Sequence, residues 1–258
     1  MSLADQASLA SLKNDFDRDG FIAIKPLFDA DRIAEINREF DRYVRDCVPQ
    51  MKDTEVFYEE KGAQGTLKQM QNMQHYDGYF RTLLETDIIR DLAETMLGEK
   101  ARAVNLEYFN KPAGIGKPTP PHQDGYYFHF NPPAAVTGWL ALERVDPENG
   151  CIHYVRGSHK AEGYRPHGRS EILGFSQGIT DFGTEDDKAN TVAFPGDAGT
   201  FLMHHSKTVH WAGPNVSPTR ARRALGFVYF GESATVDEAA KAVYQAKLQA
   251  DLRAAGKI

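Results

Sequence analysis

The sequence predicts a mostly β protein with flanking helices, built on a barrel or jelly-roll core. From about residue 100 onward, short β-rich runs alternate with turns rich in Pro, Gly and Asn, a spacing typical of closed or double-sheet architectures. Helical periodicity is concentrated near the two ends of the chain, and no repeat or linker divides it, so we expect one domain, 1–258. The expected parts are a largely helical region with a lid at about 1–99, a jelly-roll core at about 100–231 and a C-terminal helix at about 234–258.

The N-terminal region is predicted to form a helix, a strand and further helices. An apolar helical face over residues 9–16 ends at an Asp-Gly turn. The stretch "FIAIKPLF" predicts a short strand, which Pro26 places at a sheet edge. Asp29 or Asp31 is expected to cap the next helix, and another helix is expected over about 79–98.

The stretch 51–78 has no clear period. Long irregular segments in such folds often cover an active site, so we expect a substrate lid here. Gln71, Gln74 or His75 would then contact substrate, the alternative being that they are solvated loop residues.

Charge and cysteine content narrow the class of protein. The net charge of −6 provides no basic field for nucleic acid. Cys47 and Cys151 lie far apart, which indicates free thiols and a reducing compartment, and we expect a cytoplasmic protein. The N-terminus does not resemble a signal peptide, and no apolar run is long enough to cross a membrane. The oligomeric state is not predicted.

The stretch "PPHQDGYYFHF" is the first candidate for metal binding. His122 and Asp124 are two positions apart, so they project from one face if this stretch is an extended strand, while Gln123 faces the other way. A neutral imidazole and a carboxylate aimed together supply two ligands for a divalent metal. This short pattern also occurs by chance, as a surface pair or a hydrogen-bonded pair.

Two later stretches strengthen the metal hypothesis. "FLMHHSKTVHWAGPN" contains His204, His205 and His210, one of which can complete a site of two histidines and one carboxylate. That set is typical of non-haem Fe(II) oxygenases, which keep coordination positions open. In "NVSPTRARRALGFVYF" a strand is expected to begin at about Arg222, whose planar guanidinium suits the far carboxylate of a metal-bound dicarboxylic acid.

With these motifs the chain resembles the phytanoyl-CoA dioxygenase family of Fe(II)- and 2-oxoglutarate-dependent oxygenases. The resemblance covers nearly the whole chain and implies a double-stranded β-helix, or jelly roll. Its segments are "F-x-x-D-G-F" at 16–21, "PHQD" at 121–124, "GWLALERVDPENGCIHYVRGSH" at 138–159 and "PGDAGTFLMHHSKTVHWAGPNVSPTRARRAL" at 195–225.

The resemblance also implies roles for individual residues. His122, Asp124 and His210 would bind Fe(II), and Arg222 would bind 2-oxoglutarate, although a one-residue insertion leaves Arg223 as an alternative. The presence of the carboxylate favours hydroxylation over halogenation. The further expected cosubstrate contacts are Trp139, Asn105 and Lys68, and the expected substrate contacts are Tyr126, Tyr127, His129 and Gln71.

Several of these residues also have structural interpretations. Tyr126, Phe128 and Phe130 alternate, so they fit the core of one sheet face equally well. His204 and His205 are expected to pack at a strand end.

The predicted activity is hydroxylation of an aliphatic carbon in a small polar metabolite, with 2-oxoglutarate and O₂ consumed and succinate and CO₂ released. Two alternatives remain open: a jelly-roll isomerase or hydrolase that uses another divalent metal, and a non-catalytic binding relative. The sequence does not identify the substrate.

Overall fold

The computed structural model describes residues 3–60, 63–85, 88–169, 177–239, 241–243 and 246. The largest β-sheet in these residues forms one wall of the molecule. Its antiparallel strands run in the order β1-β11-β6-β13-β4-β3-β2. The strand bounds in that order are Phe21–Ile24, Phe201–His205, Ala135–Ala141, Arg222–Gly231, Ala101–Lys111, Leu67–Met70 and Val56–Tyr58.

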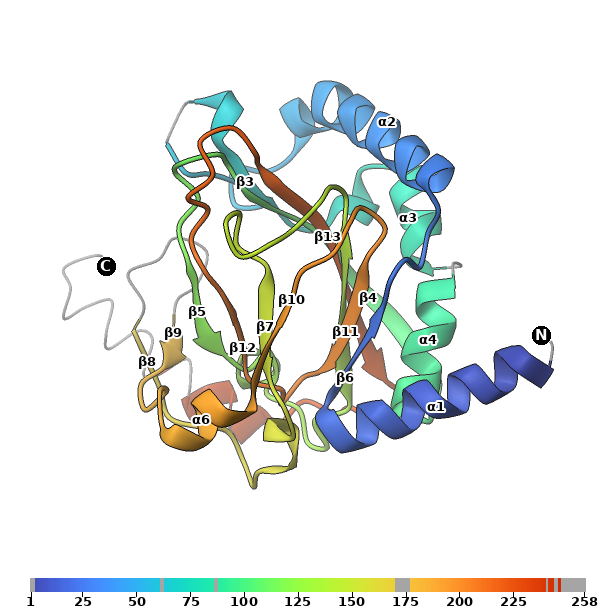
Figure 1. Ribbon diagram of the computed structural model, residues 1–258, viewed down its shortest axis with the longest axis vertical. Coiled ribbons are helices and arrows are strands. Elements are labelled where there is room, and N and C mark those ends of the chain that lie inside the picture. Colours follow the sequence, from blue (N-terminus) through green and yellow to red (C-terminus); the bar gives the residue numbers. More distant parts are fainter. Residues whose placement is uncertain are drawn as a thin grey trace.

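A smaller antiparallel sheet lies across the inner face of the larger one (Figure 1). Its order is β10-β7-β12-β5, with strands Thr191–Phe194, Ile152–Val155, His210–Ala212 and Thr119–His122. A separate two-stranded ribbon pairs β8 (His167–Arg169) with β9 (Gln177–Ile179). Two facing antiparallel sheets form a jelly roll, which confirms the predicted fold class.

Four of the helices, α1 to α4, cover the outer face of the large sheet (Figure 1). The α-helices α1 to α6 are Leu3–Asp19, Ala30–Asp46, Gly78–Glu85, Ile88–Leu97, Gly125–Phe128 and Glu185–Asn190. Short 3₁₀ turns lie at Val48–Gln50, Gln64–Thr66, Met73–His75 and Ser158–Lys160. No helix in the described ranges has the length and apolar content needed to cross a membrane.

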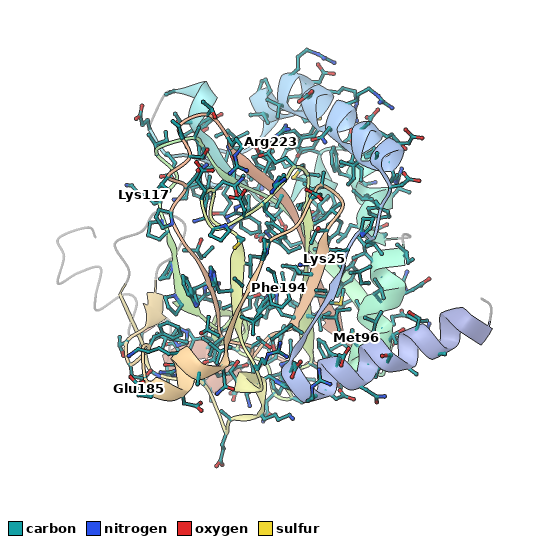
Figure 2. The ribbon with its side chains drawn as sticks, viewed as in Figure 1. Lys25, Met96, Lys117, Glu185, Phe194 and Arg223 are labelled. Carbon is teal, nitrogen blue, oxygen red and sulfur yellow. The ribbon has the colours of Figure 1, made fainter. Side chains whose placement is uncertain are left out.

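The large sheet is buried on both faces. Met96 of α4 belongs to the core between helices and sheet, whereas Phe194 of β10 belongs to the core between the two sheets (Figure 2). Along β13, Leu225 and Phe227 pack toward the helices. The alternating positions therefore face the interior of the jelly roll, where a site can form.

Several local predictions agree with the structure. The strand β1 is at the edge of the sheet, as the following Pro26 predicts. Asp29 caps α2, and its side chain accepts a hydrogen bond from the backbone N–H of Arg32 at 2.9 Å. The helix expected over 79–98 is divided into α3 and α4.

Two expected segments need comment. The stretch 51–78 contains the short hairpin β2–β3, which extends the large sheet beside β4, so part of the stretch expected to be irregular is regular sheet, and the lid role stays a prediction. Most of the C-terminal helix expected over 234–258 lies outside the described residues.

A buried asparagine connects a turn of the small sheet to the start of β13. The Asn149 side chain accepts a hydrogen bond from the N–H of Asp146 at 2.8 Å. It donates to the carbonyl oxygens of Arg144 at 2.9 Å and Ala221 at 3.0 Å. Asn149 is fully buried, and Ala221 immediately precedes Arg222, so this side chain fixes where β13 begins.

We expect Asn149→Ala to lower the free energy of unfolding by about 2–3 kcal/mol, because it leaves buried backbone groups without partners. Urea denaturation measures the change. Asn14→Ala, at an exposed position on α1, is the control and should change stability by less than about 0.5 kcal/mol. Equal stability of the two variants would contradict this role for Asn149.

Candidate metal centre

Two histidines from neighbouring strands face each other inside the jelly roll. His122 ends β5 and His210 begins β12, and the two residues are direct partners in the antiparallel register. Their ring centroids are 4.0 Å apart, and both residues are buried. Strand pairing therefore juxtaposes two imidazoles that are 88 positions apart in the sequence.

Asp124 lies next to the two histidines, but its backbone conformation is not the one predicted. The strand ends at His122, and Asp124 has helical backbone angles (φ −57°, ψ −40°) at the start of α5. The prediction that His122 and Asp124 project from one extended strand is therefore wrong. The turn into α5 brings Asp124 Oδ1 to 3.4 Å from His122 Nε2 and 3.5 Å from His210 Nε2.

The three side chains form a cluster suited to a metal ion. One potential ligand atom from each lies within 4.8 Å of the others. His122 Nδ1 is 2.8 Å from the carbonyl oxygen of Pro120, and His210 Nδ1 is 3.1 Å from that of Thr208. An Nδ1–H that donates to a carbonyl leaves the Nε2 lone pair free to bind metal.

Burial favours the neutral form of the His210 ring. Desolvation, followed by the neighbouring imidazoles of His122 and His204, holds the pKa of His210 well below its usual range, so the ring is neutral. Burial opposes ionisation of Asp124, but His210, His122 and His204 together keep its pKa well below the usual value. The cluster thus presents a neutral His210 imidazole and an ionised carboxylate, which suits binding of a divalent metal.

The second carboxylate oxygen of Asp124 is held by two donors. Thr137 Oγ1 on β6 donates to Asp124 Oδ2 at 2.7 Å, and His204 Nε2 on β11 donates to it at 3.0 Å. The Tyr154 hydroxyl, 2.9 Å from His204 Nδ1, donates to that nitrogen. Oδ1 is thereby left to face the imidazoles.

The role of His204 was missed in the sequence, where strand-end packing was expected. The pattern that could have indicated it is alternation: His204 follows the inward-facing Leu202 by two positions.

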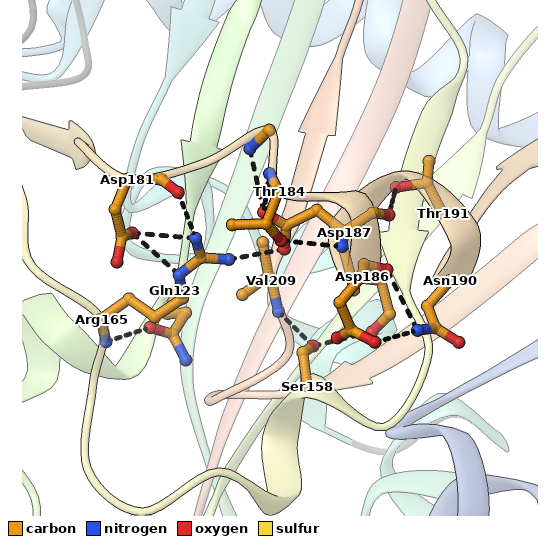
Figure 3. A network of polar contacts seen from close by, with 12 residues as sticks. Gln123, Ser158, Arg165, Asp181, Thr184, Asp186, Asp187, Asn190, Thr191 and Val209 are labelled. Carbon is orange, nitrogen blue, oxygen red and sulfur yellow. Dashed lines mark hydrogen bonds and ion pairs between the residues drawn. The ribbon is translucent and has the colours of Figure 1, made fainter.

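Gln123 points away from the cluster, as predicted. Its side chain donates to the carbonyl oxygen of Lys207 at 2.7 Å and accepts from the N–H of Arg165 at 2.9 Å. Arg165 in turn pairs with Asp181 at 2.9 Å and with Asp187 at 2.6 Å (Figure 3). This network fixes the backbone between His122 and Asp124 from the side opposite the cluster.

A cavity of about 410 Å³ opens beside the cluster and is lined by His122, Asp124 and His210. Arg222 also lines it and is only 4% exposed. The Arg222 guanidinium carbon lies 5.4 Å from the centre of the Trp139 ring, and Arg222 Nε has no hydrogen-bond partner among the described residues. Burial lowers the Arg222 pKa to about 10. A buried, incompletely paired cation in a cavity indicates an anionic ligand.

The neighbouring arginines form ion pairs with other acidic side chains. Arg223 projects from the other face of β13 and pairs with Glu143 at 3.1 Å. Arg220 pairs with Asp146 at 2.9 Å and also contacts Glu148. Strand alternation thus turns Arg222 alone of these three into the cavity.

Two lysines lie in the same part of the cavity wall. Lys68 is buried and lies 3.1 Å from Glu59 Oε1. Lys111 donates to the carbonyl oxygen of Lys117 and to Thr119 Oγ1 at 3.2 Å. Burial, then the charges of Arg222 and Lys68, lower the Lys111 pKa to about 6. Together with Arg222 these residues make one part of the cavity wall basic, although burial leaves Lys111 mostly neutral near pH 7.

The predicted substrate contacts are only partly brought together. Tyr127 and Gln71 line the cavity, as do Asn105, Lys68 and Trp139 from the predicted cosubstrate set. Tyr126 does not line it and stacks on His167 with ring centroids 3.9 Å apart.

His129 also lies outside the cavity lining, in a left-handed conformation (φ 54°) after α5. The expected strand alternation of Tyr126, Phe128 and Phe130 is wrong, because Gly125–Phe128 is helical.

A second acid in the cavity, Glu107 on β4, was not singled out in the sequence. It is half-buried, and Asn105 Nδ2 donates to its Oε1 at 2.8 Å. Burial, together with the like charge of Asp124, raises the Glu107 pKa to about 8. Its position two residues after Asn105 on one strand was the available signal.

The jelly roll has two histidines and a carboxylate on one side of its cavity, and a buried arginine lines the same cavity. These features define a non-haem iron dioxygenase that uses 2-oxoglutarate. The family model "Phytanoyl-CoA dioxygenase (PhyH)" matches residues 16–224. The chain belongs to this family.

Curated relatives are similar over most of the chain. Phytanoyl-CoA dioxygenase, peroxisomal, of Mus musculus is 29% identical over 232 residues, which are 84% of this chain and 67% of that protein. A probable alpha-ketoglutarate-dependent hypophosphite dioxygenase of Stutzerimonas stutzeri is 29% identical over 212 residues, covering 80% of this chain and 73% of the relative. The chain spans 62% of the human phytanoyl-CoA dioxygenase, at 28% identity.

Solved structures share the fold. The epimerase SnoN, in complex with Fe3+, alpha ketoglutarate and nogalamycin RO, is 27% identical, with a TM-score of 0.70 and coverage of 90% of this chain and 87% of SnoN. EctD from S. alaskensis, bound to 2-oxoglutarate and 5-hydroxyectoine, is 19% identical with a TM-score of 0.70, covering 92% and 78%, a likeness of fold alone.

Removing one of the donors to Asp124 tests how the carboxylate is oriented. We expect Thr137→Val, which keeps the side-chain shape but removes the hydroxyl, to weaken Fe(II) binding roughly tenfold or more. Anaerobic titration against a chelator measures the affinity. Thr54→Val, at an exposed turn position, is the control. Unchanged affinity in the Thr137 variant would mean that His204 suffices to orient Asp124.

The raised pKa of Glu107 predicts a pH-dependent cost to stability. The folded value of about 8 exceeds the usual 4.5, so the stabilising effect of protonation is complete below about 4.5 and is lost as pH rises through 8. Between about pH 5 and pH 9, the metal-free wild type should lose on the order of 3 kcal/mol relative to Glu107→Gln.

Urea denaturation at both pH values, with a chelator present, measures this loss. Exposed Glu162 supplies the control variant Glu162→Gln, which should follow the wild type. Parallel pH curves for wild type and Glu107→Gln would contradict the assignment.

Proposed function

We propose that this protein hydroxylates an aliphatic carbon of a small polar metabolite, consuming 2-oxoglutarate and O₂ and releasing succinate and CO₂. The observation that supports this most strongly is the buried Arg222, which lines the same cavity as His122, Asp124 and His210. A hydrolase or isomerase that uses another divalent metal has no need of that guanidinium.

The donor set fits Fe(II). Two imidazole nitrogens and one carboxylate oxygen, all on one side of the cavity, are ligands that suit ferrous iron and leave positions for other ligands. Bound iron would supply the activation of O₂ that the side chains cannot provide themselves. The contribution of Pro120, Thr208, Thr137 and His204 is to fix the orientation of the three ligands before metal arrives.

The cationic part of the wall fits the far carboxylate of 2-oxoglutarate. Arg222 can grip a carboxylate with two parallel N–H donors, and the Trp139 ring supports the guanidinium. Lys68, whose amine is buried beside Glu59, lies in the same part of the wall. This arrangement orients the cosubstrate with its other end toward the metal cluster.

The rest of the cavity fits a small substrate and excludes bulk water. Phe128, Val228 and Phe230 supply apolar surface on the lining. By family resemblance, the carboxylate of Asp124 favours hydroxylation, since halogenating relatives have a small residue there. Similar proteins named for phytanoyl-CoA, hypophosphite and an epimerisation show that relatives differ in substrate and outcome, so the substrate must be inferred from this chain's own cavity.

Removing the Arg222 guanidinium should separate cosubstrate binding from metal binding. Anaerobic Fe(II) and 2-oxoglutarate are expected to give a weak visible charge-transfer band with the wild type. Arg222→Ala should raise the 2-oxoglutarate concentration needed for half of that band by roughly 10- to 100-fold, since a buried charge-assisted contact is lost.

Arg223→Ala is the matched control and should behave as wild type, because Arg223 pairs with Glu143 on the other face of β13. Succinate release under O₂ should follow the same order. Full 2-oxoglutarate affinity in Arg222→Ala would refute the proposed cosubstrate site.

A further inference from the structure

We propose that Glu107 is the substrate-binding residue of this cavity and that it holds a protonated amine, so the substrate is an ammonium compound. This proposal makes the proposed function more specific. It rests on that function for the claim that the bound ammonium compound is the substrate. Glu107 lines the cavity together with Gln71 and Asn105.

Charge is segregated within the cavity. Arg222, Lys68 and Lys111 share one region, and the acid there, Glu59, is paired with Lys68. Glu107 forms no ion pair with any basic side chain in the described part of the chain, and the charge that acts on it is the like charge of Asp124. A carboxyl group enclosed without a cation is costly unless a ligand supplies one.

The orientation of the Glu107 carboxyl is fixed in advance. The N–H of Asn72 donates to Asn105 Oδ1 at 2.8 Å, which turns Asn105 Nδ2 toward Glu107 Oε1, also at 2.8 Å. One carboxyl oxygen is thereby occupied, and the other remains for a ligand. Such a chain of hydrogen bonds preorganises a binding group.

A second acceptor lies next to Glu107. The register of β3 against β4 pairs Gln69 with Phe109 and Met70 with Tyr108. Continued by one residue, it places Gln71 opposite Glu107, and both side chains line the cavity. A carboxylate oxygen and an amide oxygen together match the donors of an ammonium group, which has no acceptor of its own.

The strand register relates Glu107 to the metal cluster through Asn105, two residues before it on β4. Val228 on β13 is the partner of Asn105 on one side and of Thr137 on the other, and Thr137 holds Asp124. Two strand spacings separate β4 from β6, a lateral distance of about 10 Å. An amine held at Glu107 would leave a carbon several bonds away facing the cluster.

A glycine on β13 lets the Phe109 ring pack close to the sheet next to Glu107. Gly226 pairs with Glu107 on β4 and with Trp139 on β6. A Cβ atom at position 226 would lie 2.6 Å from Phe109 Cε2 and 3.6 Å from Glu107 Cβ. The absent side chain makes room for the Phe109 ring, which lines the cavity beside Glu107.

Equilibrium binding of three probes of equal length tests the proposal: butylammonium, 1-butanol and butyrate. The protein is loaded with Zn(II) and 2-oxoglutarate, so no turnover occurs, and ligand-observed NMR titrations are made in mildly alkaline buffer. Wild type should bind butylammonium roughly tenfold or more tightly than 1-butanol, and butyrate more weakly still.

Glu107→Gln should abolish the preference for butylammonium, and Gln71→Leu should reduce it. Glu162→Gln, at an exposed acid, should keep it and so excludes binding to surface carboxylates. Thermal unfolding shows that each variant is folded, and Glu107→Asp provides a second carboxylate that should retain part of the preference.

Equal binding of butylammonium and 1-butanol by the wild type would overturn the proposal, because Glu107 would then act as a neutral donor or not at all. So would an unchanged preference in Glu107→Gln. These outcomes are distinct from a failure of the proposed function, which would appear as no Fe(II)–2-oxoglutarate band and no succinate, whatever the amine preference.

Discussion

The rest of the site depends on the Asp124 carboxylate, whose two oxygens make different contacts. Oδ1 faces His122 and His210 on the small sheet, while Oδ2 accepts hydrogen bonds from Thr137 and His204 on the large sheet. One carboxylate thus joins the two walls of the jelly roll. Because both donors are buried, the carboxylate cannot rotate without leaving polar groups unpaired.

Strand alternation then organises the cavity. On β13, Arg222 faces inward and Arg223 pairs with Glu143 on the opposite face. On β4, Asn105, Glu107 and Lys111 share the inward face, with the acid and the lysine four residues apart. A rise of about 3.4 Å per residue separates the Cα atoms of these two residues by about 13 Å. A single pleated surface therefore presents an acid and a base in separate regions, which suits two ligands of opposite charge.

Placing ionisable groups inside the cavity lowers the stability of the empty protein, because burial disfavours their charged forms. Burial lowers the pKa of Arg222 to about 10 and that of Lys111 to about 6, and it raises that of Glu107 to about 8. Each shift opposes the charged form in the empty protein, and bound ligands of complementary charge would reverse it. The large sheet is buried on both faces, and its apolar core offsets the unfavourable burial of these ionisable groups.

The sequence by itself determined the β-rich class, the pairing of a histidine with an aspartate at 122 and 124, and a short list of third ligands, because composition and residue spacing are local properties. Only the tertiary structure decided that Asp124 begins a helix. Gly125 donates to the carbonyl oxygen of Ser206, and Tyr164 leaves no room for a side chain at position 125. The roles of His204 and Glu107 likewise follow from strand register between distant segments, which periodicity along one chain cannot specify.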